Sequence, residues 1–435
     1  MSAEAPDASE VFVLPGLRSP FAKLDRELAD HDGLELSVPV VQQTVAGPRG
    51  PGRERAHRVD LVLWGQVIPD LHISNWGREV WLESRLDRHV PAQNVSQACG
   101  TSLAASTHAA GQIRAGTVDL ALCGGVESMT WTDLGLKPGL SRTLRRVAQA
   151  GSPGRALKAL GELRPGDIGL HIPTATERTT GMTMGEHAEL MAREWDIRRD
   201  AQDQLAVRSH HRAAEAAEEG FFRDLLVSPG TFEVDGDALV RPDTSVEAVA
   251  ALPPSFDRER GTLTAANSTP LTDGAACVWV ASAEGASRLP DGLPRVRLVD
   301  WEQAAIDPES EGLLMAPALA VPRLLARHGL RYEDVALWEI HEAFAAQVLC
   351  TYAALEDEDW LTERAGVDRA MGPFPTDRVN PNGGSVALGH PFGATGARIL
   401  SQAAAELAEE PSGTRGVVSI CAAGGLGHVA LLEAV

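Results

Sequence analysis

Disulfide and zinc-binding cysteine patterns are missing from this chain. It has five cysteines in 435 residues, at positions 99, 123, 277, 350 and 421. The number is odd and no two cysteines form a C-x-x-C pair, which argues against a disulfide framework and a structural zinc site. Free thiols fit a reducing compartment. The cysteines are therefore available for packing or for chemistry.

Positive charge and aromatic residues are also scarce. The chain has 39 Lys and Arg against 60 Asp and Glu, a formal net charge of −21. Nonspecific nucleic-acid binding needs a basic surface, so we expect no nucleic-acid partner. Aromatic residues make up 5% of the chain, so Ala, Val, Leu and Gly must fill its core.

Long hydrophobic runs are absent as well. None approaches the ~18 residues that a membrane-spanning helix needs. Residues 1–10 are acidic and polar, without the basic and then apolar pattern of a secretory signal. We therefore expect a flexible N-terminal tail over residues 1–10 and a cytoplasmic protein.

What the chain does have is an alternation of short apolar segments with Ala- and Leu-rich segments. This pattern predicts an α/β fold with covered sheet faces. The expected strands are 11–16, 59–68, 119–125, 336–340 and 416–420, and the expected helices are 100–116, 183–194, 201–219 and 397–407.

The alternation is interrupted between residues 130 and 254, where Gly, Pro, Arg and Thr break the pattern. We interpret 130–254 as an inserted loop or lid region. It separates an N-terminal half, 11–129 with 255–285, from a C-terminal half, 286–435. Each half has an apolar strand, a glycine-rich turn and a cysteine at the end of an element. No fixed-period identity relates the halves, so the pattern indicates a repeat only weakly.

Cys99 lies in the segment NVSQACGTS at 94–102, just before the expected helix. A helix N-terminus presents unpaired N–H groups and a partial positive charge, which favour a thiolate and predict a lowered thiol pKa. The same N–H groups can bind the oxyanion of a tetrahedral intermediate. An ordinary buried cysteine is the alternative.

Three other residues lie at the ends of expected strands or inside glycine-rich loops. Cys421 begins CAAGGLG at 421–427, whose glycines suit a tight turn beside a ligand. His390 lies in GHPFG at 389–393 and could accept a thiol proton. His341 begins HEAFA at 341–345 and could donate to a thioester oxygen. A core cysteine and hydrogen-bonded or solvated histidines are the alternatives.

Two other kinds of site do not fit the pattern. No G-x-G-x-x-G motif follows a first strand with an acidic residue downstream, which argues against a dinucleotide site. The His and Cys residues are not at metal-ligand spacing along the chain, so we expect no metal.

Taken together, these motifs resemble those of the thiolases (3-ketoacyl-CoA thiolase, acetyl-CoA acyltransferase). Within that family the chain is most similar to the β subunit of the trifunctional fatty-acid oxidation complex and its bacterial relatives. The segments that carry the resemblance are 16–21, 94–102, 124–129, 184–185, 261–268, 271–275, 341–345, 383–396 and 421–427. They extend from near residue 11 to the C-terminus.

The resemblance implies two similar βαβαβαββ halves, in layers α-β-α-β-α, with an inserted loop domain. It implies that Cys99 is the nucleophile, that His390 activates it and that Cys421 is the general acid and base. The N–H groups of Cys99 and Ala423 would form one oxyanion hole, and His341 with His390 the other.

The resemblance also implies a substrate-binding role for Met184, Ser268 and Thr269. Coenzyme A would be a substrate, with no cofactor and no metal. Two positions depart from many thiolases, which carry Asn at the place of His341 and Gly at that of Ala423. Histidine is typical of the trifunctional β subunits, and a backbone donor should tolerate a methyl group.

The function implied is CoA-dependent cleavage of 3-ketoacyl-CoA in fatty-acid β-oxidation, by ping-pong chemistry through an acyl-cysteine. The alternatives are a biosynthetic acetoacetyl-CoA thiolase, a ketoacyl synthase and a non-catalytic scaffold subunit of a β-oxidation complex. Cys421 argues against the synthase, and the four reactive residues together argue against the scaffold. A homo-oligomer, either a dimer or a dimer of dimers, is expected.

Residues 137–164 form a basic stretch in an acidic chain, with seven Lys and Arg against one Glu. Leucines are interspersed with them. A solvated helical face is one interpretation. The others are a contact for CoA phosphates, for an α subunit with hydratase and dehydrogenase activity, or for a membrane surface as a peripheral contact.

Overall fold

The structure is a computed structural model that describes residues 10–47, 59–171 and 175–435. The expected tail over 1–10 lies almost wholly outside the described residues. The chain divides into a main unit and a small second unit, the latter formed by 68–74 and 132–175. No helix of the described chain is long and apolar enough to cross a membrane.

The main unit is built on one ten-stranded mixed sheet. Its strands are β1 (Phe12–Arg18), β2 (Ala22–Lys23), β3 (Leu61–Gly65), β4 (Ala92–Asn94), β5 (Leu120–Glu127), β8 (Thr272–Ala281), β9 (Val296–Ala305), β10 (Leu337–Ile340), β11 (Arg415–Ala422) and β12 (Leu426–Ala434). The order is β10-β11-β12-β9-β1-β8-β5-β3-β4, with β2 pairing with β8. Every residue of β5 and β8 is buried, as expected for strands covered on both faces.

The two ends of this sheet repeat one pairing pattern. In the first half, β3 and β5 are parallel, and β5–β8 and β8–β1 are antiparallel. In the second half, β10 and β11 are parallel, and β11–β12 and β12–β9 are antiparallel. A short antiparallel pairing of β1 with β9 joins the halves. The repeat that the sequence only weakly indicates is therefore clear in the topology.

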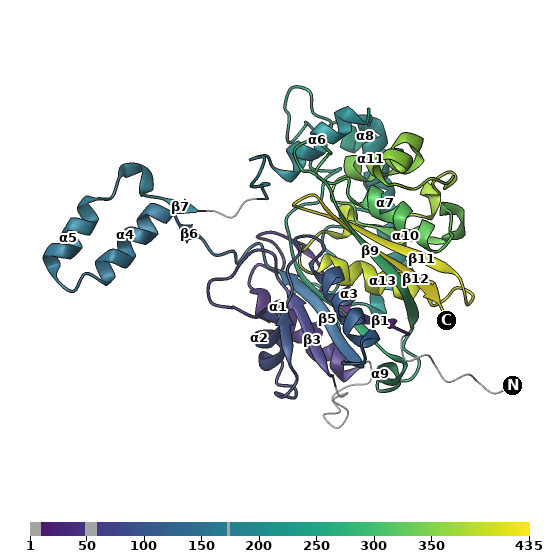
Figure 1. The fold of residues 1–435 in the computed structure, drawn as a ribbon, viewed down its shortest axis with the longest axis horizontal. Helices are drawn as coiled ribbons and strands as arrows, with labels where there is room; N and C mark the ends of the chain where they lie inside the picture. The colour runs from purple at the N-terminus through teal and green to yellow at the C-terminus, as the bar shows by residue number, and fades with distance from the viewer. Residues whose placement is uncertain (1–9, 48–58, 172–174) are drawn as a thin grey trace. The chain divides into compact units, whose positions relative to one another are not determined.

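Helices cover the sheet and fill the space between its two halves (Figure 1). The longer ones in the main unit are α1 (Gly33–Ala46), α2 (Trp76–Glu83), α3 (Thr101–Arg114), α6 (Met184–Glu194), α7 (Arg199–Glu219), α10 (Pro317–Arg327), α11 (Ala345–Glu356) and α13 (Thr395–Leu407). The short ones are α8 (Val246–Ala250), α9 (Ala283–Ser287) and α12 (Ser385–Leu388).

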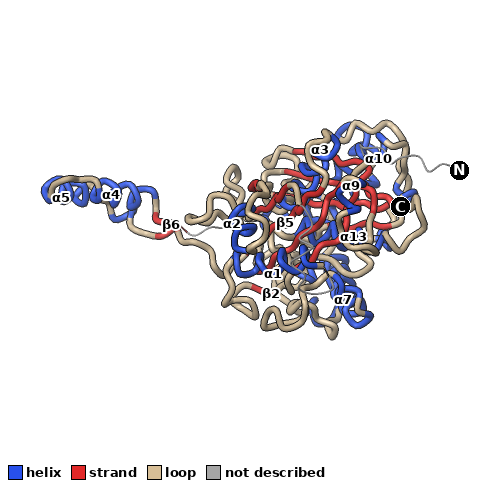
Figure 2. Tube along the Cα trace, turned by 90° about the horizontal axis from the view of Figure 1, so that it is seen from below, coloured by secondary structure: helices blue, strands red, loops and turns tan. Residues whose placement is uncertain are grey.

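Helices α3 and α13 form the central layer. One buried apolar cluster joins them to β1, β3, β5 and β8 of the first half and to β9, β11 and β12 of the second. On the outer sides, α1 and α2 pack on the first half, and α10 and α11 pack on the second. Figure 2 shows the strands running through the interior with helices around them. The predicted α-β-α-β-α layering is confirmed.

The inserted region is divided between the main unit and the second unit. Residues 176–254 belong to the main unit and include α6 and α7, close to the expected helices. The second unit contains β6 (Gly135–Leu136), α4 (Pro138–Ala148), α5 (Pro153–Gly161) and β7 (Leu170–His171). Within it, β6 pairs with β7 and α4 packs against α5.

Gly396 allows α13 to approach α3 at the level of the Cys99 turn. A Cβ at Gly396 would lie 2.3 Å from the Leu103 nitrogen and 2.9 Å from Ser102 Oγ. We expect Gly396→Ala to lower the free energy of unfolding by ~1–3 kcal/mol or more, because the added methyl group would push against the backbone of α3.

Gly111→Ala is the matched control in α3, where a Cβ meets nothing within 4 Å. There alanine should raise stability by ~0.5–1 kcal/mol, since it is the better helix former. Urea unfolding measures both variants, and equal midpoints would contradict a close helix crossing at Gly396.

Candidate active site

Cys99 lies in the turn that leads into α3. The helix begins at Thr101 with Gly100 as N-cap, so the thiol immediately precedes the helix N-terminus as predicted. Ala98 has a φ of 46°, which is uncommon for a residue with a side chain. Thr101 Oγ1 donates to the Ala98 carbonyl at 2.7 Å and accepts from the Gln97 N–H at 2.9 Å. These bonds hold the turn against the first residue of the helix.

His390 lies in the loop between α12 and α13, and its tautomer follows from its partners. Its Nδ1 lies 2.6 Å from Thr395 Oγ1. That hydroxyl donates its single proton to the Pro391 carbonyl at 2.8 Å. Thr395 must therefore accept from the Nδ1–H of His390, which leaves Nε2 unprotonated. Nε2 is buried and has no hydrogen-bond partner among the described groups.

His341 follows β10, where its N–H donates to the Ser419 carbonyl of β11 at 2.8 Å. Its Nδ1 lies 2.8 Å from Ser385 Oγ. Its Nε2, like that of His390, is buried without a partner in the described chain. The rings of His341 and His390 have centroids 4.1 Å apart, at an interplanar angle of 46°.

The structure brings Cys99 and both histidines together. Cys99 Sγ and one ring nitrogen of each histidine all lie within 4.8 Å of one another. Because both Nδ1 atoms are hydrogen-bonded elsewhere, the free Nε2 atoms are the ones available to the thiol. The N–H groups of Ala423 and of Cys99 itself are also directed at this thiol. The sulfur therefore lies beside one ring nitrogen of each histidine and two backbone N–H donors.

Cys421 joins the same group at the end of β11. It is buried, and its charge interaction with Cys99 shows that the two thiols are neighbours. Gly424 and Gly425 follow with φ of 82° and 73°. A Cβ at Gly425 would lie 2.5 Å from the Ile306 carbonyl oxygen, so the turn requires glycine there.

Burial dominates the electrostatics of this group. It raises the pKa of the Cys99 thiol to about 12, although the two backbone N–H groups act in the opposite direction. The predicted lowering of this pKa is therefore wrong for the unliganded site, because desolvation outweighs the helix N-terminus. Burial, followed by the charge of Cys99, raises the pKa of Cys421 well above its usual range.

Both histidines are neutral for the same reason. Burial, with a smaller contribution from Arg398, lowers the pKa of His390 to about 3. Burial, followed by His390 and Arg398, lowers the pKa of His341 well below its usual range. The resting group thus consists of two neutral thiols and two neutral imidazoles. A reaction that uses the Cys99 sulfur must remove its proton as the bond forms.

These pKa values predict how Cys99 reacts with an uncharged alkylating reagent. In His390→Ala, which lacks the base, we expect the rate with iodoacetamide to rise about tenfold per pH unit from pH 6 to 9 without a plateau, because only the thiolate then reacts. Peptide mass spectrometry follows the modified Cys99, with Cys99→Ser as the control. A plateau that reports a thiol pKa below 8 would contradict a protonated resting thiol.

The three predicted substrate-binding residues occupy different settings. Met184 is the first residue of α6, which Thr183 and Glu186 cap, and it packs partly buried against the main core. Ser268 is buried beside Phe344, and its Oγ has no partner in the described chain. Thr269 Oγ1 donates to the Ala343 carbonyl at 2.5 Å. Ser268 and Thr269 therefore lie against the segment that follows His341.

Buried polar side chains hold the two histidine segments in place, and sequence reasoning gave them no role. Glu342 accepts from Asn380 Nδ2 and Ser209 Oγ, both at 2.7 Å, and from the Val386 N–H at 3.2 Å. Asn380 also pairs with both backbone groups of Ile340. Glu342 belongs to the HEAFA motif at 341–345, which is the sequence signal that points to it.

The cluster of Cys99, His341 and His390 has the sulfur and nitrogen donors that zinc prefers. The spacing of these residues along the chain argues against a metal site, but the fold brings all three together. Both histidines are also hydrogen-bonded through Nδ1, as metal-binding histidines usually are. A thiol that needs a general base would use the same arrangement of residues.

The comparisons with known proteins agree on one family. The family profiles described as thiolase, N-terminal domain, and thiolase, C-terminal domain, match residues 11–284 and 293–434. A 3-ketoacyl-CoA thiolase of Pectobacterium carotovorum is 39% identical over 423 residues, 96% of this chain and 95% of the relative. One of Yersinia pestis is 38% identical over 428 residues, 97% and 96% of the two chains.

Solved structures show the same relationship. The acetyl-CoA acetyltransferase of Bacillus anthracis matches with a TM-score of 0.77 and 30% identity, covering 98% of this chain and 99% of that one. The Acat5 thiolase of Ascaris suum, solved in complex with coenzyme A, has a TM-score of 0.78 and 26% identity, covering 98% and 100%. The chain therefore belongs to the thiolase family of acyltransferases.

Proposed function

We propose that this protein is a degradative 3-ketoacyl-CoA thiolase in which Cys99 carries the acyl group. The observation that carries the proposal is the meeting of the Cys99 thiol with the Ala423 N–H and with two buried imidazole nitrogens that have no hydrogen-bond partner among the described residues. The relatives named 3-ketoacyl-CoA thiolase, at 38–39% identity, support the choice of substrate class.

In the first half-reaction His390 Nε2 takes the proton of Cys99 as the sulfur attacks the 3-keto carbon. The bond between carbons 2 and 3 then breaks, which leaves the enolate of acetyl-CoA and an acyl-Cys99. The neutral thiol of Cys421 protonates that enolate. The enolate oxygen and the tetrahedral oxyanion gain charge during these steps, so N–H donors aimed at them stabilise the transition state.

In the second half-reaction CoA removes the acyl group. The Cys421 thiolate takes the proton of the CoA thiol, and the CoA sulfur attacks the acyl-Cys99 carbonyl. Cys99 leaves and regains its proton from His390. Two thiols are needed because Cys99 is acylated when the enolate must be protonated.

The N–H groups of Cys99 and Ala423 lie beside the sulfur and suit one oxyanion. His341 and His390 suit the other. Met184, Ser268 and Thr269 are proposed to line the path of the acyl-CoA, and Ser268 Oγ, which has no hydrogen-bond partner in the described part of the chain, is the polar group that could contact it.

The test is CoA-dependent cleavage of 3-ketoacyl-CoA by the purified protein, followed by loss of the ketoacyl-CoA absorbance. We expect cleavage of medium and long chains. Cleavage of acetoacetyl-CoA alone would favour the biosynthetic alternative. No cleavage at any chain length, alone or with a candidate α subunit, would overturn the proposal in favour of a scaffold.

The second unit is the proposed contact with a membrane surface. Its helices α4 and α5 expose Leu144, Leu157 and Leu160, with 43%, 71% and 44% of each residue accessible. Arg142, Arg145, Arg146, Arg155 and Lys158 belong to the same two helices and are exposed. Exposed leucines beside basic side chains are typical of helices that bind anionic lipid.

Vesicle sedimentation tests this contact. The full chain should sediment with vesicles that contain anionic lipid, and not with neutral ones. Because the contact is electrostatic, the double variant Arg145→Glu with Arg155→Glu should abolish sedimentation. Its rate of thiolysis should stay within about twofold of the wild type, since neither residue belongs to the Cys99 cluster. Unchanged sedimentation of this variant would contradict the proposal. Loss of binding to an α subunit instead would assign the surface to that partner.

A homo-oligomer, dimer or dimer of dimers, remains part of the proposal. Light scattering across a range of protein concentrations tests it, and a monomer at all of them would contradict it. The predicted cytoplasmic location stays a prediction.

A further inference from the structure

Ser385 connects His341 to a buried arginine. Ser385 begins α12, is fully buried, and its Oγ lies 2.8 Å from His341 Nδ1. Arg398 Nη2 donates to the same oxygen at 2.7 Å. Arg398 lies on α13, with only 2% of the residue accessible.

The hydrogen-bond inventory fixes the direction of the bond to His341. A guanidinium only donates, so Ser385 Oγ accepts from Arg398. Among the described residues, His341 Nδ1 is the one other group bonded to that oxygen. If His341 donated as well, the Ser385 proton would have no acceptor, and a buried unsatisfied donor costs ~1–3 kcal/mol. The satisfied arrangement has Ser385 donating to an unprotonated Nδ1.

We infer that Ser385 and Arg398 hold His341 in the tautomer with its proton on Nε2, opposite to that of His390. This inference rests on the proposed function for its catalytic meaning. The His341 Nε2–H then faces the site as a neutral donor, while His390 Nε2 presents a lone pair. One imidazole accepts the thiol proton and the other donates to the oxygen that becomes negative.

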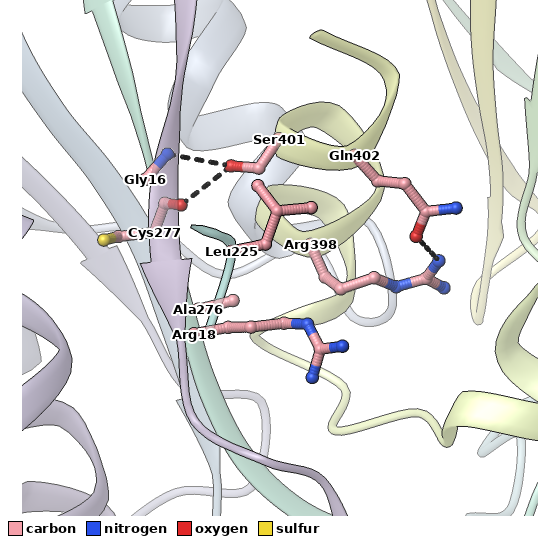
Figure 3. A pocket seen from close by; sticks show the side chains of 8 residues that line it. All are labelled: Gly16, Arg18, Leu225, Ala276, Cys277, Arg398, Ser401 and Gln402. Atoms are coloured by element: carbon pink, nitrogen blue, oxygen red, sulfur yellow. Dashed lines mark hydrogen bonds between the residues drawn. The ribbon is translucent and has the colours of Figure 1, made fainter. Parts of the chain in front are cut away.

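Arg398 is suited to this task by its charge and its anchoring. The guanidinium draws electron density from the Ser385 hydroxyl, which strengthens that hydroxyl as a donor. Arg398 Nη1 donates to Gln402 Oε1 at 3.3 Å, as Figure 3 shows, and lies 4.0 Å from Glu339 Oε2. Ser385 and Arg398 are positioning residues, since they act through His341.

Nitrogen NMR of ¹⁵N-histidine-labelled protein tests the inference without any reference to activity. Long-range ¹⁵N–¹H correlations distinguish protonated from unprotonated ring nitrogens, and His341→Asn assigns the signal. We expect protonated Nε2 for His341 and protonated Nδ1 for His390. A protonated Nδ1 on His341 would overturn the inference, even in an active enzyme. The expected tautomers in a protein without thiolysis would instead count against the proposed function alone.

Ser385→Ala gives the second arm. We expect His341 to lose its fixed tautomer and kcat to fall on the order of tenfold with KM unchanged, less than the loss of a whole oxyanion donor. Ser385→Thr keeps the hydroxyl and should restore both the NMR pattern and kcat.

Ser401→Ala is the matched control on α13. Its hydroxyl is also buried, accepts from the Gly16 N–H at 3.2 Å and donates to the Cys277 carbonyl at 3.0 Å (Figure 3). The His341 signal and kcat should stay as in the wild type. An equal loss of kcat in both variants with the His341 tautomer intact would reduce Ser385 to a structural role. If Ser385→Ala does not fold, the wild-type spectrum decides.

Discussion

Cys421→Ala is expected to lose carbon–carbon cleavage while retaining acyl exchange between acyl-CoA and free CoA. Cleavage expels an enolate that needs a proton, and removal of a general acid costs about 10²–10⁴-fold. Exchange expels only a thiolate, which needs no proton to leave. It does lose Cys421 as the base for the incoming CoA thiol, but that thiol also ionises in solution, so the rate of exchange should fall much less than the rate of cleavage. Cys99→Ala should lose both reactions, by on the order of 10⁴-fold or more.

Two assays on the same preparations measure this difference: ketoacyl-CoA absorbance for cleavage, and transfer of label between CoA pools for exchange. Cys123→Ala is the control, because Cys123 is buried in β5 away from the cluster and both rates should persist. An equal loss of exchange and cleavage in Cys421→Ala would contradict its assignment as the acid.

His390→Ala is expected to slow thiolysis by about 10²–10⁴-fold and to change its pH dependence. The pKa of His390 is lowered to about 3, so in the wild type the base is neutral from pH 5 upward and the acylation step shows no acid limb near 6.5. Without the base, only the thiolate fraction of Cys99 reacts, and its pKa of about 12 predicts a tenfold rise per pH unit.

The kcat/KM for ketoacyl-CoA from pH 5 to 9 measures both profiles. His428→Gln is the control, since His428 is also buried with its pKa lowered to about 3 but bonds to Gln97, Thr107 and Gln303 instead of the cluster. Its pH profile should match the wild type. A wild-type acid limb near pH 6.5 would contradict a neutral resting imidazole.

The sequence predicts those parts of the molecule that local patterns determine. The apolar runs at 336–340 and 416–420 are β10 and β11, and the segment at 100–116 is α3, each within one or two residues. Cys99 and His390 each precede a helix of the central layer, and His341 joins them from the end of strand β10. Strand ends and helix starts in a layered fold meet at one edge, which makes such residues identifiable without coordinates.

What the sequence did not predict depends on contacts between distant segments. The thiol pKa follows from burial by both halves, whereas the helix N-terminus alone predicted the opposite direction. The tautomers depend on Thr395 and Ser385, whose bonding partners are visible only in three dimensions. The separation of 132–175 from 176–254 is a matter of contacts, although the basic stretch 137–164 lies within the first of these two segments.

The most direct measurement is the intact mass of the protein mixed with a 3-ketoacyl-CoA in the absence of free CoA. We expect the release of one equivalent of acetyl-CoA and a mass increase equal to the shortened acyl group, located on Cys99 and removed when CoA is added. Acetyl-CoA release without acylation, or an acyl group on any other residue, would contradict this expectation.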